Sequence, residues 1–340
     1  QKPKIALYAK RTFGEKLTAT IDFIKINWKI ILKFVTYLLL PVCLLQAAGI
    51  NKVMGNTYTM GLHAGMMDES ASDWAMMGLQ YFLYYIITFI GSIILYSLIY
   101  AMMRVYSERE EGLQGVTLSM LKPILFRNLK RTLLCALFLI VLAVVAGILI
   151  VSLALLSGFT LILTVPAIFA VIVPLVLFSP IYLFEDISLW DAFLKTYRLG
   201  FATWGGIFAI CFVTGLLGGI LQTITTLPWY VATIVKMIFG MSDGGTAMTV
   251  SPLYSFVLYI LGVLQAYGTY LGAVFMVVGI GYQYGHASET LDSVTVVSDI
   301  DNFEKEQFKN VIETSQDLKL EITTLFKAST DIENDLTNIS

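Results

Sequence analysis

The fold is decided by one uncharged stretch, residues 132–184, which reads TLLCALFLIVLAVVAGILIVSLALLSGFTLILTVPAIFAVIVPLVLFSPIYLF. A helix needs about 20 predominantly apolar residues to cross the ~30 Å hydrocarbon layer of a bilayer. The stretch is long enough for two crossings, and Ser157-Gly158 is the natural place for the chain to turn back. The sequence therefore predicts two membrane-spanning helices that form a hairpin.

The composition of the whole chain agrees with a membrane protein. Hydrophobic residues make up 57% of the 340 residues, charged residues make up 14%, and the mean hydropathy is +0.77. A soluble domain carries roughly 25% charged residues. Too few charges remain to cover a water-facing surface, so most of the chain must be solvated by lipid. The net charge of −2 argues against a nucleic-acid partner.

Six segments are long and apolar enough to cross a bilayer. They are residues 30–50, 76–102, 132–156, 159–184, 205–225 and 253–284. We therefore predict an all-α, polytopic integral membrane protein with six transmembrane helices in three hairpins. Residues 1–29 form an N-terminal cytoplasmic or interfacial segment, 30–285 the transmembrane domain, and 286–340 an acidic cytoplasmic tail with an amphipathic helix.

The distribution of basic residues predicts the orientation. Of the 22 lysines and arginines, all but Lys52 and Lys236 lie on one side of the predicted spans. Basic residues concentrate on the cytoplasmic side of membrane proteins. We expect both termini in the cytoplasm and, because no organellar signal is evident, a bacterial inner membrane. Residues 1–28 lack the features of a signal peptide, so the first span is expected to direct insertion.

An amphipathic segment precedes each odd-numbered span. Apolar residues recur at helical spacing in 13–28, 118–129 and 190–204, and Lys16 falls on the polar side of the first segment. Thr12-x-x-Glu15 and Ser188-x-x-Asp191 have the spacing of capping boxes. Such helices lie in the headgroup plane with their apolar face in the acyl chains, or pack onto the cytoplasmic face of the bundle. The sequence allows both.

The junction between the second and third hairpins carries a family resemblance. It reads FEDISLWDAF over residues 184–193 and continues with YRLG over 197–200, after a run that contains Pro174 and Pro180. This pattern resembles bacterial six-span membrane proteins similar to the membrane domain attached to some glycerophosphodiester phosphodiesterases. The resemblance covers residues 1–285 in architecture. It implies a membrane module without the catalytic barrel, and it carries over no catalytic residue.

Ionisable residues are rare within the predicted spans, where only Lys33 occurs, close to an end. Charged groups at mid-depth normally mark ion pathways, so their scarcity argues against a proton- or sodium-coupled transporter. Five glutamines are the polar residues most able to act, and we expect them to form hydrogen bonds between helices. They are Gln46, Gln80, Gln222, Gln265 and Gln283.

Glycines and prolines predict the packing and shape of the later spans. Three G-x-x-x-G pairs place small residues on one helix face, which lets helix backbones approach closely. The pairs are Gly215/Gly219, Gly268/Gly272 and Gly281/Gly285. They can pack the fifth and sixth spans together or bind another subunit. Pro166 and Pro174 should kink or break the fourth span. Residues 227–239 are expected to form a separate short helix at the outer interface.

Few residues suggest chemistry. Met60-x-x-His63-x-x-Met66 offers Cu(I) ligands, although methionine is also an ordinary filler of apolar loops. Asp186 and Asp191 could form a carboxylate pair, but helix capping explains them more simply. We interpret the three cysteines as small hydrophobic residues, and we predict no catalytic residue, cofactor or metal site. The cysteines are Cys43, Cys135 and Cys211.

The tail, residues 286–340, differs abruptly from the rest of the chain. It holds twelve acidic residues and four lysines, a net charge of −8. Its hydrophobic residues from Phe308 to Phe326 form an approximate helical stripe. We expect an amphipathic helix that docks on the basic underside of this protein, on a partner, or nowhere.

The function predicted from these features is non-catalytic. Close-packing glycine faces, the acidic tail and the shortage of reactive groups favour a scaffold or accessory subunit of a membrane protein assembly. Its expected partners are membrane lipids and membrane proteins bound through the glycine faces or the tail. The alternative is a transporter or channel for a lipid or small apolar solute, which would use the kinked fourth span. An enzyme acting on lipid headgroups is a third class.

Overall fold

A computed structural model describes residues 4–63, 71–242 and 251–297. It also describes scattered positions of the tail, which are residues 299–300, 303, 307, 315–316, 318–319 and 323. These residues form helices and no strand. The chain divides into two compact units, Gln1–Ala287 and Ser288–Ser340.

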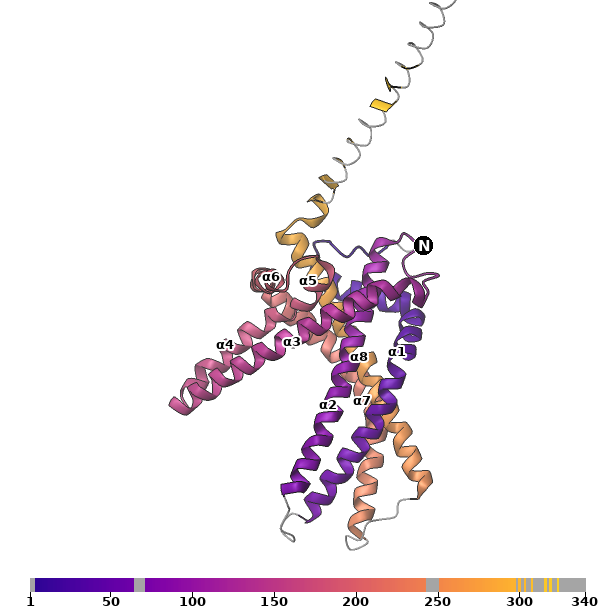
Figure 1. Ribbon diagram of the computed structural model, residues 1–340, viewed down its shortest axis with the longest axis vertical. Helices are drawn as coiled ribbons and strands as arrows, with labels where there is room; N and C mark the ends of the chain where they lie inside the picture. Colours follow the sequence, from indigo (N-terminus) through magenta and orange to yellow (C-terminus); the bar gives the residue numbers. More distant parts are fainter. Residues whose placement is uncertain are drawn as a thin grey trace, which may run out of the picture. The chain divides into compact units, whose positions relative to one another are not determined.

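The described part of the first unit is built from eight helices (Figure 1). They are α1 (Phe13–His63), α2 (Ala71–Glu108), α3 (Leu118–Leu156), α4 (Thr160–Leu175), α5 (Phe178–Phe184), α6 (Leu189–Ala202), α7 (Trp204–Ser242) and α8 (Pro252–Leu291), the last of which runs into the second unit. Six helical stretches are long and apolar enough to cross a membrane, with α4 and α5 counted together. The prediction of an all-α, six-span membrane protein is confirmed.

Two of the three amphipathic segments are continuous with the spans that follow them, because 13–28 belongs to α1 and 118–129 to α3. Only the third forms a helix of its own, α6. The apolar stripe of the first segment is divided: Trp28 is 53% exposed, whereas Ile24 packs against the core. The stripe of the second segment packs against the core. Lys16, predicted on the polar side, is instead buried.

The helix ends follow the local sequence. The Thr12 backbone N–H donates to Glu15 Oε2 at 2.7 Å, and the Glu15 N–H donates to Thr12 Oγ1 at 3.4 Å, which confirms the predicted capping box. The predicted turn at Ser157-Gly158 is also confirmed, since α3 ends at Leu156 and α4 begins at Thr160. The Thr160 hydroxyl donates to the Leu153 carbonyl at 2.8 Å and closes this turn.

The prolines differ in their effect on helix continuity. Helix α4 ends just after Pro174 and α5 begins at Phe178, so the predicted break occurs there. Pro166 lies inside α4 without ending it. Pro228 likewise lies inside α7, so the prediction of a separate helix over 227–239 is wrong. Prolines are tolerated inside transmembrane helices where neighbouring groups can bond to the carbonyl that the proline frees.

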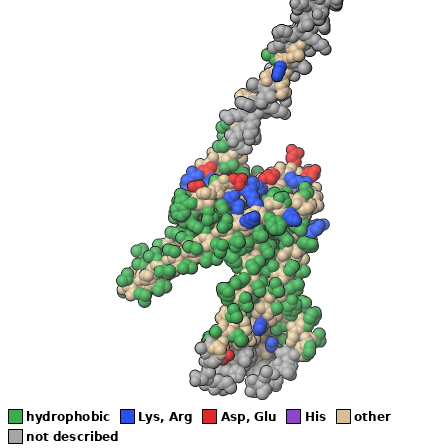
Figure 2. Space-filling model, in the orientation of Figure 1, with side chains coloured by type: hydrophobic (Ala, Val, Ile, Leu, Met, Phe, Trp, Pro, Cys, Tyr) green, Lys and Arg blue, Asp and Glu red, His purple; other side chains and the backbone are tan. Residues whose placement is uncertain are grey.

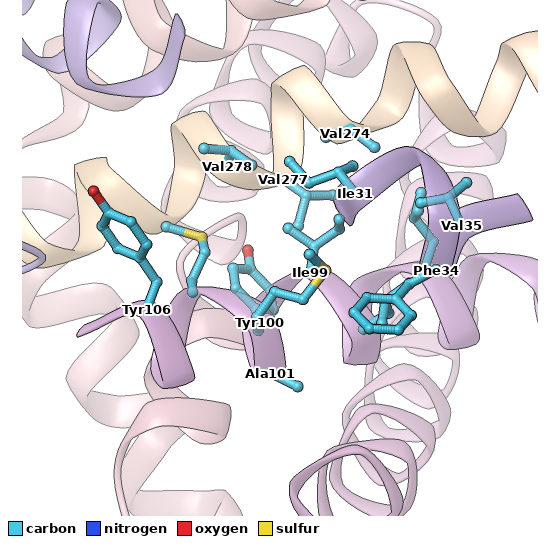
Figure 3. Packing of buried hydrophobic residues seen from close by; sticks show 14 of the residues in the cluster. Ile31, Phe34, Val35, Ile99, Tyr100, Ala101, Tyr106, Val274, Val277 and Val278 are labelled. Atoms are coloured by element: carbon cyan, nitrogen blue, oxygen red, sulfur yellow. The ribbon is translucent and has the colours of Figure 1, made fainter. Parts of the chain in front are cut away.

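The main core lies between α1, α2 and α8 (Figure 3). Phe34 of α1, Ile99 of α2 and Val277 of α8 are among its buried residues, and the short side chains on α8 let the three helices approach closely. This filled interior holds α1, α2 and α8 together. Helix α7 (Trp204–Ser242) contacts α8 where Gly218 meets Gly272, and we call these four helices the bundle.

Polar side chains join the bundle helices, as predicted, at three of the five glutamines. Gln46 of α1 donates to the Thr88 hydroxyl of α2 at 2.8 Å, and Gln80 of α2 accepts from Asn56 of α1 at 2.7 Å. Gln283 of α8 accepts from Lys16 of α1 at 2.7 Å. Hydrogen bonds of this kind contribute about 0.6–2 kcal/mol each to helix association within a membrane.

Two of the three glycine pairs pack within the chain. A Cβ atom on Gly218 would lie 2.4 Å from the Gly272 carbonyl oxygen, so α7 and α8 cross in backbone contact. A Cβ atom on Gly285 would lie 2.1 Å from the Leu7 carbonyl oxygen. The pair Gly215/Gly219 differs, because a Cβ atom on either residue would meet nothing within 4 Å. This third face is therefore open.

We predict that Gly218→Ala lowers stability by about 1–3 kcal/mol, because the new methyl group overlaps the α8 backbone. Gly219→Ala is the matched control, since its methyl group enters open space and alanine favours the helix. Thermal unfolding of the two variants in the same detergent compares them. Equal melting temperatures would mean that α7 and α8 do not cross at Gly218.

Candidate functional site

Basic residues gather at one end of the first unit (Figure 2). This basic end holds residues 4–11, the α2–α3 connection and the stretch from α5 to α6, which are joined by hydrogen bonds. Lys4 Nζ, for example, donates to the Ser107 carbonyl at 2.7 Å. Lys52 and Lys236 lie instead near the C-terminal ends of α1 and α7.

Glu185, from the motif that carries the family resemblance, binds side chains of two helices at this end. Its Oε2 atom lies 2.8 Å from Lys195 Nζ of α6, and both side chains are mostly buried. Its Oε1 atom accepts from the Tyr284 hydroxyl of α8 at 2.9 Å. The Tyr8 and Tyr284 hydroxyls are 3.3 Å apart, and burial raises the pKa of the Tyr8 phenol, so this hydroxyl stays protonated. One carboxylate thus joins α6, α8 and the N-terminal segment.

Asp186 binds α3 instead. Its Oδ1 atom pairs with Arg127 and lies 3.4 Å from Arg131 Nη1. Arg131 Nη2 also donates to the Glu185 carbonyl at 2.9 Å and to the Ile187 carbonyl at 3.1 Å. We call Arg127, Arg131, Glu185, Asp186, Lys195 and Tyr284 the polar junction. It fixes the basic end of α3 to the start of α6.

The two aspartates do not form a carboxylate pair. The Asp191 N–H donates to Ser188 Oγ at 3.1 Å, and the Ser188 hydroxyl donates to Asp191 Oδ2 at 2.6 Å, which confirms capping for Asp191. The capping explanation is wrong for Asp186, which pairs with the two arginines of α3. Both carboxylates therefore have structural partners.

The rest of the resemblance motif makes a tight packing contact. A Cβ atom on Gly200 of α6 would lie 2.5 Å from Pro174 Cβ and 2.8 Å from its Cα. Glycine lets α6 cross directly over the end of α4 at this point. The motif residues therefore have a common structural role, which is to set the base of the second hairpin.

Beyond this base the second hairpin leaves the bundle. Between Cys135 of α3 and Val173 of α4 every side chain is exposed or half-buried. We call residues 136–172 the arm, and Figures 1 and 2 show it projecting away from the bundle. Of the most apolar part of α3, 6% is buried, against 56% for α2. The arm therefore leaves most of its apolar surface outside the protein core.

The arm meets α7 through one aromatic cluster. The Phe169 ring lies 6.0 Å from the Trp204 ring and 5.8 Å from the Phe208 ring, and Trp204 Nε1 donates to the Ala170 carbonyl at 3.0 Å. Phe208 stacks in turn on Phe212 at 6.2 Å. This contact shows which face of α7 is directed at the arm.

An open region continues from this cluster. Residues three, four or seven positions apart share a helix face, so Gly215 and Gly219 follow Phe208 and Phe212 on the face directed at α4. Leu216 beside them is 52% exposed, and Ile162 and Val165 on the matching face of α4 are 71% and 59% exposed. We call this region, bounded by the arm and by residues 212–219 of α7, the apolar wedge. Neither wall carries a charged residue.

The remaining candidates give no site. The side chains of Met60, His63 and Met66 lie outside the described residues, so copper binding there stays a hypothesis. Within the described ranges no group of three His, Cys, Asp or Glu side chains is close enough to hold a metal. The three cysteines are free thiols, and Cys43 and Cys135 are buried.

Comparison with known proteins gives no relative: no family model, curated protein or solved structure matches the chain. The resemblance to membrane domains of glycerophosphodiester phosphodiesterases therefore stays a prediction.

We expect Arg131→Gln to lower stability by about 2–4 kcal/mol, because Arg131 donates to two carbonyls as well as to Asp186, and hydrogen bonds to charged groups are the stronger ones. Lys130→Gln is the control, since Lys130 is the exposed neighbour. Thermal unfolding in detergent gives the comparison. Indistinguishable melting curves would remove the polar junction as the anchor of α3.

Proposed function

We propose that the protein is a non-catalytic scaffold or accessory subunit that holds a transmembrane helix of a partner protein in the apolar wedge. The observation that supports this most directly is the arm, in which residues 136–172 bury no side chain. The glycine face of Gly215 and Gly219 opens on the same region.

The type of surface favours a helix as the partner. Helices associate within membranes through van der Waals packing over small residues, because lipid supplies no hydrophobic driving force. The chain already uses this contact on an adjacent face of α7, where Gly218 meets Gly272. Gly215 and Gly219 repeat the arrangement on a face that lacks a neighbouring element within 4 Å. A partner helix fits this face without any change in the α7 backbone.

The base of the arm suits a scaffold. Arg127 and Arg131 tie α3 to the start of α6, and the contact between Pro174 and Gly200 ties α4 to the same helix. The arm is therefore held at its base while its length is left open. A surface that is positioned in this way and not self-buried is suited to binding in a defined orientation.

Photo-crosslinking tests the proposal directly. With benzoylphenylalanine in place of Phe212, in the wedge, irradiation of membranes should join the chain to one discrete protein. The same probe in place of Tyr37, which is 71% exposed on α1, should not. Gly219→Leu should abolish the Phe212 crosslink by filling the glycine face, whereas Gly14→Leu, at an equally open position, should leave it intact. Equal crosslinking at residues 212 and 37 would refute a partner in the wedge.

A second candidate is a carrier for a lipid or small apolar solute, favoured by one observation: the wedge is lined by α4, the fourth span. An acyl chain would enter it sideways from the bilayer, since buried side chains fill the core of the bundle. In the same experiment, adducts of the Phe212 probe with phospholipid alone would support this candidate over the scaffold.

The acidic tail is a second proposed contact surface for a partner. Its described residues after Asp299 all lie in helical backbone. Of the expected apolar stripe, Leu318 is described and is 58% exposed. The other stripe residues lie outside the described part of the tail.

We propose a bacterial inner-membrane location with the basic end in the cytoplasm, in keeping with the positive-inside rule. Alkaline phosphatase, which is active only outside the cytoplasm, should be inactive when fused after Ser340 and active when inserted within residues 64–70 or 243–250. The reverse pattern would invert the proposed topology.

A further inference from the structure

One buried lysine lacks a carboxylate. Lys16 is 4% exposed, and its Nζ atom donates to Gln283 Oε1 at 2.7 Å. Among the residues that the structure describes, no Asp or Glu oxygen forms an ion pair with it. Lys195, which is less buried, has Glu185 at 2.8 Å. A buried ammonium group normally has an anion beside it.

The partner of Lys16 is itself incompletely bonded. Gln283 is fully buried, and its Nε2 atom has no hydrogen-bond acceptor among the described residues. Buried amide groups are almost always paired. Lys16 and Gln283 thus leave N–H donors without acceptors at one place between α1 and α8.

Helix α7 brings its first turn to the same place. A Cβ atom on Gly206 would lie 3.0 Å from Lys16 Nζ and 3.2 Å from Gln283 Nε2. Gly206 is the third residue of α7, where backbone N–H groups lack helical acceptors and attract anions. Gly205 is exposed and Gly206 half-buried, so this end of α7 can be reached from outside.

The neighbouring charges add to the positive field. Arg11 lies alongside, where its backbone N–H donates to His286 Nδ1 at 3.0 Å, and its guanidinium group donates to the Leu7 carbonyl at 3.2 Å. Glu15, the acidic residue closest in sequence, is exposed and accepts from Thr12 in the capping box. Lys16 therefore lies beside N–H donors of Gln283 and α7, and no described carboxylate is paired with it.

We propose that Lys16, Gln283 and the first turn of α7 form a binding site for a phosphate group. The site lies at the basic end, where the first span begins, and lipid phosphates are abundant at the surface of a bilayer. Basic sites between transmembrane helices on the cytoplasmic side bind lipid headgroups in this way. The phosphate belongs either to such a headgroup or to a free anion, and it supplies the countercharge and acceptors that Lys16 and Gln283 lack.

Native mass spectrometry of the full chain in detergent tests the site, with phosphatidylglycerol or inorganic phosphate titrated separately. We expect one ligand per chain at low concentration, and at least a tenfold loss of affinity in Lys16→Gln. Lys10→Gln, at an exposed lysine of the same end, is the control and should bind as the natural chain does. Binding of phosphatidylglycerol alone assigns the site to a headgroup. Displacement of phosphatidylglycerol by an equal concentration of inorganic phosphate assigns the site to the free anion.

A second variant separates binding from folding. Gln283→Glu places a carboxylate beside Lys16, so it should keep or raise the melting temperature while it removes phosphate binding. Lys16→Gln or Gln283→Glu that folds and binds with unchanged affinity would overturn the proposal. If Lys16→Gln does not fold, the result for Gln283→Glu decides.

Discussion

The structure depends on the inability of hydrocarbon to solvate charge. An ionised group at mid-depth costs several kcal/mol, and backbone groups there must be bonded within helices. The charged side chains therefore collect at the two ends of long helices, with most of the basic residues at one end. There they are close enough to bind one another, and the polar junction follows from that crowding. Glu185 and Asp186, adjacent in one short connection, form ion pairs with Lys195, Arg127 and Arg131.

The same constraint separates the two halves of the first unit. In the bundle, glycines and short side chains let helices touch, and buried side chains fill the space between α1, α2 and α8. In the arm, the side chains are large and apolar, and lipid solvates them as well as protein would. A hairpin of this composition gains little by folding back onto its own bundle. It is free to serve as surface for something else, which is why the proposed scaffold function is placed there.

The sequence predicted the number of spans, the turn at Ser157-Gly158 and both capping boxes. Each of these features depends on residues that are neighbours along the chain. The direction of the arm was not predictable in this way. The same apolar run 132–184 would suit a closed six-helix bundle, and its divergence depends on contacts across the chain, such as Pro174 with Gly200. The prediction for Lys16 was wrong for a related reason. Helical periodicity placed it on a polar face, but the face that α1 buries is chosen by α7 and α8.

The break after Pro174 gives the two helices of the arm unequal mechanical roles. Helix α4 ends there and is joined to α5 by a short link, whereas α3 runs from the polar junction to the tip without interruption. With a rise of ~1.5 Å per residue, a tilt of about 10° at that link would displace the far end of α4 by about 4 Å. Such a tilt also requires α3 to bend. The α4 side of the hairpin can therefore pivot at the link, whereas the continuous helix α3 resists the motion. The stiffness of α3 therefore sets how wide the apolar wedge can open.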